Sequence, residues 1–497
     1  MTNNARPGSA RASTGIAGLD EILQGGLPRN HTYLIQGTFG TGKTTLALQF
    51  LLAGAQAGET TLHFSLGETS AELQEVAHGH GWSLAGIQLH ELIPLLMTQL
   101  EERQTIFPVT EVELDEVTTE ILRVLDQVRP QRVVFDFVSQ LRLLATTPLR
   151  YRQQLLALRQ QLIKLGCTAL FLSNEILEGR DSTLDSLVHG VITLTRTTPA
   201  YGNVRRRLEI AKIRGIRYSG GYHDFEIYTG GLEVYPRIPP GSTRPKAAQI
   251  SLSCGVAGLD QILGGGLETG TACVIMGQAG TGKSTVTQLY AQAALERGER
   301  VAVYLFDEGR DPWLVRAAHL GMAFEDAEAL GQLHLFEIDP DLVSPGQFVT
   351  SVRQLVEQQA VQVMILDSLT GYLAAMVEGQ SLLTQIHQLL VALARRGVLS
   401  LIVVTQHGLF DMGRYDGLDM SYLADTVVLL RHFEAAGVVR KAISVVKKRY
   451  GAHEHTIREL SINTEGVKIG PPLTAFRGVL TGSPEYTGGA GTDEHDR

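Results

Sequence analysis

The chain has 497 residues, too many for a single hydrophobic core and enough for two domains of ordinary size. Hydrophobic residues make up 44% and charged residues 19% of the sequence, which is typical of a globular protein and excludes a largely disordered chain. The formal charge of −9 makes nucleic acid an unlikely partner, because no overall positive field attracts phosphates.

The cysteines and the N-terminus predict the compartment. The three cysteines, Cys167, Cys254 and Cys273, form no close pair, so the sequence predicts neither a disulfide framework nor a zinc site. The first residues lack the apolar core of a signal peptide, and no apolar run is long enough to span a bilayer. We therefore expect a cytoplasmic protein that does not enter a membrane.

The first predicted strand, residues 32–35, leads into the segment GTFGTGKT at residues 37–44 and then into a predicted helix at residues 45–55. The segment fits the phosphate-loop pattern G-x-x-x-x-G-K-[ST]. In this pattern backbone N–H groups surround phosphate oxygens, the lysine reaches the outer phosphates, and the hydroxyl residue holds Mg²⁺. Anions are also favoured at the N-terminus of the helix that follows.

The same unit recurs 240 residues later, where a predicted strand at residues 272–276 leads into GQAGTGKS at residues 277–284 and a helix at residues 285–295. The flanking segments GIAGLD and GVAGLD, at residues 15–20 and 255–260, keep the same offset. The candidate ATP-binding residues are Gly37, Gly40, Thr41, Gly42, Lys43, Thr44 and Thr45 in the first copy and Gly277, Gly280, Thr281, Gly282, Lys283, Ser284 and Thr285 in the second. The sequence predicts two nucleotide sites.

The remaining predicted elements alternate strands and helices. Further apolar strands are expected at residues 61–66, 132–135 and 168–172, with counterparts at 301–306, 363–366 and 400–404, and helices at 150–165 and 381–396. Continuous apolar strands between helices indicate an α/β fold in which helices cover both faces of a mostly parallel sheet. We expect domains at residues 1–240 and 241–481, a proline-rich linker at 238–245 and a flexible tail at 482–497.

Acidic residues follow two strands of each half. Asp136 and Asp367 end apolar strands beside the phosphate loops, which favours a role in holding Mg²⁺; a solvated strand-end acid is the alternative. Glu68 in the first half, and Asp307 and Glu308 in the second, are candidates for the group that activates water or a hydroxyl. Asp307 is also a candidate magnesium ligand, and capping of the next helix is the alternative for all three acids.

A Lys-x-Arg pattern lies near the end of each half, at Lys212 and Arg214 and at Lys447 and Arg449. Residues two apart on a strand face the same side, so both cations could point at one phosphate group. A charged edge strand that protects against aggregation is the alternative. The run of arginines at residues 205–207 is interpreted as a charged strand face rather than a nucleic-acid patch.

With these motifs the chain resembles the KaiC family, whose members have two tandem RecA-like ATPase domains. The resemblance covers nearly the whole sequence, including RRRLEI at residues 205–210 and ADTVVLL at residues 424–430. It implies a two-tiered homohexamer that binds ATP and Mg²⁺ between subunits, with the Lys-x-Arg pairs acting on a neighbour's nucleotide. It also implies slow ATP hydrolysis in the first domain, a circadian-type timing or signalling role, and Kai-type or signalling proteins as partners.

For the second domain the resemblance implies autokinase activity. The family's acceptor pair, a serine followed by a threonine, falls on Ser421 and Tyr422, so Ser421 is the expected phosphoacceptor and the threonine is replaced. A further upstream hydroxyl falls on Asp416. The family's paired glutamates are also altered, because Gly67 stands before Glu68 and Asp307 stands before Glu308.

Two other functions remain open from the sequence. A DNA-handling ATPase of the RecA or helicase type shares the phosphate loop and the sheet, although the charge is negative and no zinc module is visible. A nucleotide-switched scaffold with little catalysis is the other, and Gly67 in place of a carboxylate keeps it open for the first half.

Overall fold

A computed structural model describes residues 11–92, 109–136, 138–145, 147–174, 182–199, 202–238, 249–374, 379–406, 414–415, 418–480 and 484–488. The chain divides into two compact units, Met1–Arg237 and Ile238–Arg497. Most of the expected linker at residues 238–245 and much of the expected tail lie outside the described residues. No described helix is long and apolar enough to cross a membrane.

The first unit is built on a nine-stranded sheet with the order β11-β10-β9-β8-β3-β7-β6-β4-β5. Its strands are β3 (Thr32–Gly37), β4 (Thr61–Ser65), β5 (Gln88–Glu91), β6 (Arg132–Asp136), β7 (Thr168–Asn174), β8 (Gly190–Thr197), β9 (Arg205–Ile213), β10 (Tyr222–Tyr228) and β11 (Gly231–Tyr235). The six strands from β8 to β5 are parallel, and β9, β10 and β11 extend the sheet in antiparallel pairs. The parallel part therefore presents all its carboxyl ends at one edge.

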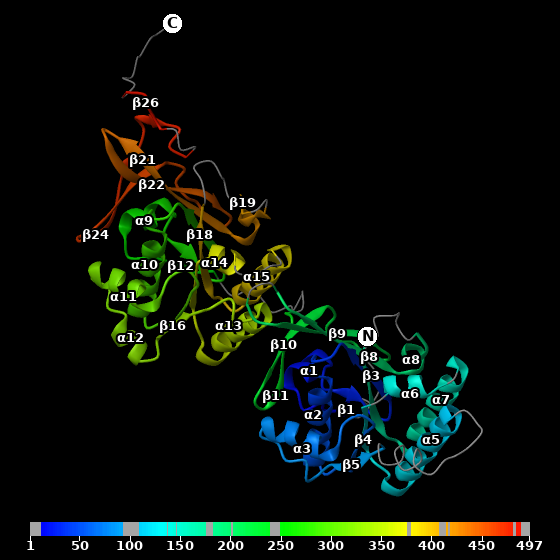
Figure 1. The fold of residues 1–497 in the computed structure, drawn as a ribbon. Helices are drawn as coiled ribbons and strands as arrows, with labels where there is room; N and C mark the ends of the chain where they lie inside the picture. The colour runs from blue at the N-terminus through cyan, green and yellow to red at the C-terminus, as the bar shows by residue number, and fades with distance from the viewer. Residues whose placement is uncertain are drawn as a thin grey trace, which may run out of the picture. The chain divides into compact units, whose positions relative to one another are not determined.

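Helices cover both faces of this sheet (Figure 1). They are α1 (Ala17–Ile22), α2 (Lys43–Gln56), α3 (Ser70–Gly79), α5 (Val109–Val128), α6 (Val138–Leu144), α7 (Pro148–Leu165) and α8 (Ser182–Leu187). Successive residues of β3 enter opposite cores: Tyr33 and Ile35 pack with α2, whereas Leu34 packs with α5 and α7. This alternation buries both faces, which explains why the parallel strands read as continuous apolar runs.

The second unit repeats this plan with the strand order β16-β15-β17-β18-β14-β21-β22-β23-β24. Its strands are β14 (Ala272–Gly277), β15 (Val301–Leu305), β16 (Leu333–Glu337), β17 (Val363–Asp367), β18 (Leu399–Thr405), β21 (Thr426–Ala435), β22 (Val438–Lys448), β23 (Arg458–Asn463) and β24 (Gly466–Pro472). Its helices are α9 (Ala257–Ile262), α10 (Lys283–Glu296), α11 (Arg310–His319), α12 (Glu325–Ala329), α13 (Pro345–Gln359), α14 (Leu369–Ala374) and α15 (Gly379–Ala394). The predicted fold class, two tandem RecA-like α/β domains, is confirmed.

Short elements complete the two units. The strand pairs are β1 (Arg11–Ala12) with β2 (Leu27–Pro28), β12 (Ser251–Leu252) with β13 (Leu267–Glu268), β19 (Arg414–Tyr415) with β20 (Leu418–Asp419), and β25 (Phe476–Arg477) with β26 (Glu485–Tyr486). A 3-10 helix, η1 (Met420–Leu423), precedes β21. The amphipathic helices α5 and α13 were not among the predicted elements. Helix α13 begins with a capping box, a pattern visible in the sequence, in which Ser344 and Gln347 each accept a hydrogen bond from the other's backbone N–H.

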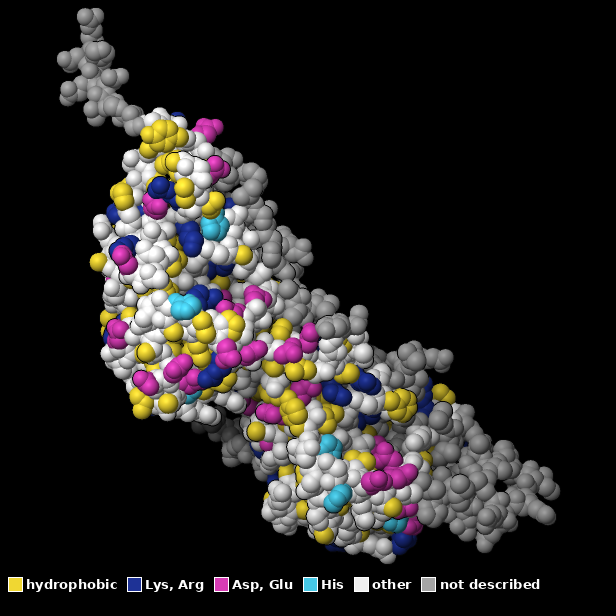
Figure 2. Space-filling view, turned by 60° about the vertical axis from the view of Figure 1, so that its left-hand side comes forward, with side chains coloured by type: hydrophobic (Ala, Val, Ile, Leu, Met, Phe, Trp, Pro, Cys, Tyr) yellow, Lys and Arg dark blue, Asp and Glu magenta, His cyan; other side chains and the backbone are white. Residues whose placement is uncertain are grey.

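Charged side chains of both signs are interspersed on the face drawn in Figure 2. The arginine run of β9 follows this pattern, because Arg206 lies 3.6 Å from Glu226 and Arg207 lies 3.3 Å from Asp224 on the adjacent strand β10. Both pairs agree with a charged strand face, as expected for residues 205–207.

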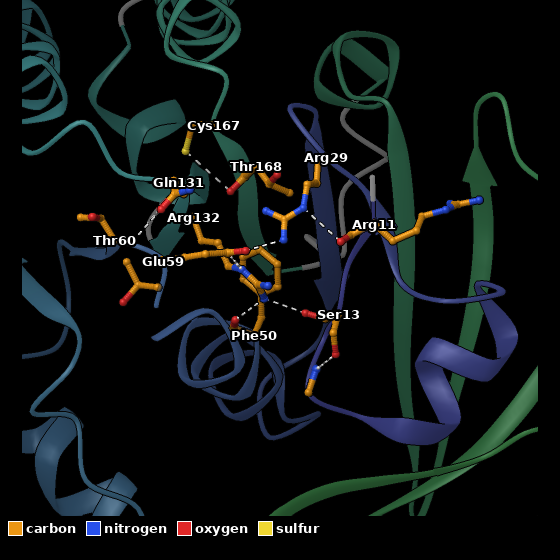
Figure 3. A network of polar contacts seen from close by, with 12 residues as sticks. Arg11, Ser13, Arg29, Phe50, Glu59, Thr60, Gln131, Arg132, Cys167 and Thr168 are labelled. Carbon is orange, nitrogen blue, oxygen red and sulfur yellow. Dashed lines mark hydrogen bonds and ion pairs between the residues drawn. The ribbon is translucent and has the colours of Figure 1, made fainter. Parts of the chain in front are cut away.

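A buried guanidinium joins distant segments of the first unit (Figure 3). Arg132, at the start of β6, is 1% exposed and donates to the Glu59 carboxylate, to the Ser13 carbonyl at 2.6 Å and to the Phe50 carbonyl at 2.8 Å. Glu59 also accepts a hydrogen bond from Arg29. Burial by itself raises the pKa of the Glu59 carboxyl, but the hydrogen bonds from Arg132 and Arg29 outweigh it, so the pKa is lowered.

The second unit makes the corresponding contact from a different residue. Val363 stands where β6 has Arg132, and Arg297, just after α10, donates to Glu299 at 2.8 and 3.0 Å and to the Ser253 carbonyl at 3.2 Å. Ser253 and Glu299 are the repeat counterparts of Ser13 and Glu59. The Arg297 side chain is 32% exposed, whereas that of Arg132 is 2% exposed, so only the first unit places this ion pair in its core.

We expect Arg132→Met to destabilise the first unit by about 3 to 5 kcal/mol, because it leaves the buried Glu59 carboxylate with a single cation. The matched change Arg297→Met should cost about 1 kcal/mol or less, since that pair is partly solvated. The two tryptophans, Trp82 and Trp313, report one unit each. Urea unfolding followed by fluorescence in Trp313→Phe and Trp82→Phe backgrounds measures the units separately, and equal losses from both arginine changes would contradict the expectation.

Candidate nucleotide-binding sites

The first phosphate loop lies between β3 and α2. Gly40 and Gly42 adopt the left-handed φ values of 72° and 93°, which favour glycine. A Cβ on Gly37 would lie 2.4 Å from the Leu194 carbonyl oxygen, so this position has no room for a side chain. Helix α2 starts at Lys43, two residues before the predicted start, because Gly42 takes the N-cap position. The backbone is therefore shaped as the motif requires.

Lys43 lies along this loop. Its Nζ donates to the carbonyl oxygens of Gly37 at 2.8 Å and Thr38 at 2.9 Å, and the Thr41 hydroxyl also donates to Thr38 at 2.9 Å. Burial lowers the pKa of Lys43, and the nearby Asp136 carboxylate opposes that effect. The ammonium group is thus held at the loop where phosphate oxygens are expected.

Asp136 comes to the same place from the end of β6. The Thr44 hydroxyl donates to its Oδ2 at 3.0 Å. Burial raises the pKa of Asp136, while the Thr44 hydrogen bond and the charge of Lys43 act in the opposite direction. A pocket of about 410 Å³ opens here, and the residues that line it are Phe39, Gly40, Gly42, Lys43, Thr44, Thr45, Ser65, Gly67, Glu68, Asp136, Gln140, Leu172 and Asn174.

The second loop repeats this arrangement. Gly280 and Gly282 have φ values of 75° and 102°, and Lys283 Nζ donates to the Gln278 carbonyl at 2.8 Å. The Thr281 hydroxyl donates to the same carbonyl oxygen at 2.8 Å. Thr285, like Thr45, lies in the first turn of its helix.

Asp367 is buried more deeply than Asp136. Burial raises its pKa to about 6, and a hydrogen bond from Ser284 and the charges of Arg316 and Lys283 moderate the rise. Its Oδ2 atom is buried and has no hydrogen-bond partner within the described structure. A hydroxyl beside a carboxylate, as in Thr44 with Asp136 and Ser284 with Asp367, is a donor set that fits Mg²⁺, and the orphaned Oδ2 is the kind of oxygen such an ion would satisfy.

The strand-end acids differ between the halves. Glu68 lines the first pocket, and burial, with repulsion from Asp136 and Glu72, raises its pKa. Among the described residues it forms no ion pair. Glu308 instead receives two hydrogen bonds from Arg316, at 2.7 and 2.6 Å, in a bidentate pair. The residue that corresponds to Arg316 in the first half is Val76.

These acids do not cap the helices that follow them. The N-cap of α3 is Thr69, which forms a capping box with Glu72, and the N-cap of α11 is Gly309, which has no side-chain cap. Asp307 accepts a hydrogen bond from the Ser368 hydroxyl, which in turn accepts one from the Gly371 N–H at 3.1 Å. The three acids are therefore placed toward the phosphate-loop edge rather than used for helix capping.

The Lys-x-Arg pairs lie at the other end of the sheets. Lys212 pairs across the sheet with Val191, which lies near the start of β8. The Lys212 ammonium group donates a hydrogen bond to the Asp185 carbonyl, and Arg214 follows the end of β9. In the second pair, Lys447 donates to the Ala424 carbonyl at 2.8 Å, and Arg449 donates to Asp425 at 3.0 Å. At Lys212 and Lys447 each strand is paired on one side, with β8 and β21, because the pairing with the next strand ends at Glu209 and Ile443.

The expected phosphoacceptor lies in η1, just before β21. The side chain of Ser421 and all of Asp416 lie outside the described residues. Tyr422 is 45% exposed, and its ring lies 5.4 Å from that of His387 on α15. The backbone of η1 is thus at the same end of the second sheet as Lys447 and Arg449.

Gln140 and Arg316 are two of the site residues that were not predicted. Gln140 on α6 lines the first pocket, and Arg316 on α11 holds Glu308. Gln140 comes four residues after Asp136, and Arg316 comes eight residues after Glu308, so each lies on the helix that follows a predicted acid. This position after a predicted acid is the sequence feature that could have identified Gln140 and Arg316.

Comparisons with known proteins agree with this geometry. A sequence model of the KaiC ATPase family matches residues 12–238 and again residues 252–474. The circadian clock protein KaiC3 of Synechocystis sp. is 25% identical over 98% of this chain and 97% of its own length. The circadian clock oscillator protein KaiC of Synechococcus elongatus is 26% identical over 97% of this chain and 93% of its own length.

We expect Arg316→Val, which installs the first-half residue, to speed ATP hydrolysis at the second site. An exposed ion pair is worth up to about 1 kcal/mol, so the release of Glu308 should raise the rate by roughly threefold to fivefold. Turnover is measured in a Lys43→Ala background, which silences the first loop. Arg396→Val is the matched control, because its ion pair with Glu357 joins the ends of α15 and α13 away from the loop. A lower rate for Arg316→Val would show that Arg316 supports hydrolysis.

Proposed function

Because this chain belongs to the KaiC family of ATPases, we propose that it forms a homohexamer in which each ATP site is completed by a neighbouring subunit. We further propose that its first domain hydrolyses ATP and that its second domain also phosphorylates a serine of the same protein. The observation that carries this proposal is the separation, within each domain, of the phosphate loop from the Lys-x-Arg pair.

The strand register measures this separation. Lys212 pairs with Val191, which pairs with Leu34, three residues before the loop begins at Gly37. At about 3.3 Å per residue this is roughly 10 Å along the sheet, in the direction away from the phosphates. Lys447, Val427 and Val274 have the same relation to Gly277. A domain's own cations are thus at the wrong end of its sheet for its own nucleotide, and a neighbouring subunit in a ring can use them instead.

Each residue of the proposed first site has a defined task. Lys43 and the loop N–H groups bind the outer phosphates of ATP, and Thr44 with Asp136 would hold Mg²⁺, which when bound neutralises charge on the phosphates. Glu68 accepts a proton from the attacking water. The new bond joins the water oxygen to the γ-phosphorus, and the bond to the β-phosphate oxygen breaks. Lys212 and Arg214 of the adjacent subunit stabilise the negative charge that develops.

The proposed kinase step uses the same geometry in the second domain. The Ser421 hydroxyl of one subunit attacks the γ-phosphorus of ATP bound at Lys283 and Ser284 of its neighbour. Its proton passes to Asp307 or Glu308, and ADP leaves. Ser421 and the Arg449 cation lie at one end of the sheet, so both arrive from the same subunit.

The names of the relatives support a proposal for the biological role. Two proteins that match over nearly the full chain are named as circadian clock proteins. We propose timing or signalling in the cytoplasm, with a Kai-type or signalling protein as partner. The bidentate ion pair between Arg316 and Glu308 favours a second possible function for the second domain, namely a nucleotide-switched scaffold with slow turnover.

Catalysis between subunits is tested by mixing two inactive variants. Arg449→Ala removes the donated cation and Lys283→Ala removes the loop charge, so each variant alone should lose second-site activity. A mixed ring contains some interfaces with an intact loop and an intact Arg449, and activity should return in proportion to them. Phosphate transfer is measured against the mixing ratio, with mixed rings confirmed by mass. Failure to recover activity at any ratio would contradict a shared site.

The kinase function is tested with γ-labelled ATP and Mg²⁺, followed by mapping of the labelled residue. We expect phosphate on Ser421, and its loss in Ser421→Ala. Tyr422→Phe is the matched control, because it removes only the adjacent phenol, and it should keep the label. A hydroxyl misplaced by about 1 Å can slow in-line transfer by on the order of a hundredfold, so Tyr422 should not substitute for the expected threonine. Label on Tyr422, or ATP hydrolysis without any labelled residue, would overturn the kinase assignment.

A further inference from the structure

Each nucleotide site places a glycine opposite a polar side chain. In the first half the glycine follows the strand and the polar residue lies on the helix, whereas in the second half these positions are reversed. In the first half the strand-end residue is Gly67, and a Cβ built on it would lie 2.9 Å from Nε2 of Gln140. In the second half the strand-end residue is Asp307. The residue four positions after Asp367, which corresponds to Gln140, is Gly371, and a Cβ built on it would lie 1.9 Å from Asp307 Oδ1.

Each site therefore has room for one polar group at this place. The group comes from helix α6 in the first half and from the end of β15 in the second. Where the second half has the Asp307 carboxylate, the first half has Gly67, and the Gln140 amide lies in the space beside it. The Gln140 amide therefore occupies space that a side chain at position 67 would need.

The amide of Gln140 is placed to act on a ligand. It lines the same pocket as Lys43, Glu68 and Asp136. Its Oε1 atom is buried and has no hydrogen-bond partner within the described structure. A buried acceptor without a donor is unfavourable, so a water molecule or a ligand is the natural source of the missing hydrogen bond.

We propose that Gln140 orients the attacking water in the first site, and this proposal rests on the hydrolytic function proposed above for the first domain. Gln140 Oε1 accepts one O–H of the water, and Glu68 takes the other proton as the oxygen bonds to the γ-phosphorus and ADP leaves. Glutamine serves this purpose in other nucleotide hydrolases because its amide holds water without competing for the proton. The first site thus combines one base with one amide, whereas the second has two carboxylates.

The proposal is tested by first-site turnover in a Lys283→Ala background, with ring assembly confirmed. Gln140→Ala should lower kcat by roughly a hundred- to a thousandfold, as the loss of one positioned polar group does in other enzymes. The affinity for ADP should change by less than about twofold, because Gln140 contacts the water rather than the diphosphate. Gln154→Ala is the matched control, since that glutamine on α7 bonds Asp115 outside the pocket, and it should keep the full rate.

Affinity for ADP with aluminium fluoride, which mimics the transferring phosphoryl group, gives a readout independent of turnover. Gln140→Ala should weaken this complex by the same factor as kcat, and the double change Gly67→Asp with Gln140→Gly, which copies the second half, should recover part of both. An unchanged kcat, or equal losses of ADP and ADP–aluminium fluoride affinity, would overturn the role of Gln140. If the Lys283→Ala protein itself hydrolyses no ATP, the proposed hydrolytic function fails, and the aluminium fluoride affinities still decide whether Gln140 acts on the transferred group.

Discussion

The shared direction of the parallel strands in each sheet is the constraint on which both nucleotide sites depend. Because β3, β6 and β4 run in the same direction, the phosphate loop, Asp136 and Glu68 all leave the sheet at one edge. The same pairing of β14, β17 and β15 assembles the second site. The antiparallel strands that follow carry the Lys-x-Arg pairs back to the opposite edge, so each sheet has its phosphate loop and its Lys-x-Arg pair at different ends.

Two copies of one fold have acquired different electrostatics. The carboxyl of Glu68 has a raised pKa and forms no ion pair in the described structure, which agrees with its proposed role as proton acceptor. The equivalent Glu308 is neutralised by Arg316, and Asp307 is bound by Ser368. These differences come from single residues on or beside the neighbouring helices, while the phosphate loops and the aspartates that end β6 and β17 stay alike. The two halves therefore share the geometry of the phosphate loop and differ in the charges beside it.

The parts of the site that could be predicted from the sequence are those formed by residues close together in the chain or at the ends of parallel strands. The phosphate loops, their strands and helices, and the acids that end β6 and β17 follow from short-range pattern and the direction of parallel strands. Gln140 and Arg316 could not be assigned in this way, because their importance depends on which side chain they meet across the pocket. Gln140 matters because Gly67 leaves space, and this pairing joins residues on two elements that only tertiary packing brings together.

The buried Arg132 also bears on the order in which the first unit assembles. Its partners Ser13, Phe50 and Glu59 precede it by 119, 82 and 73 residues, so its hydrogen bonds close long loops. Such contacts carry a large chain-entropy cost and form only after the segments that supply them have met. During synthesis the N-terminal segment, α2 and the start of β4 must wait for β6 to emerge before this ion pair exists. In the second unit Arg297 lies two residues from Glu299, so the equivalent pair can form at once and sets no such order.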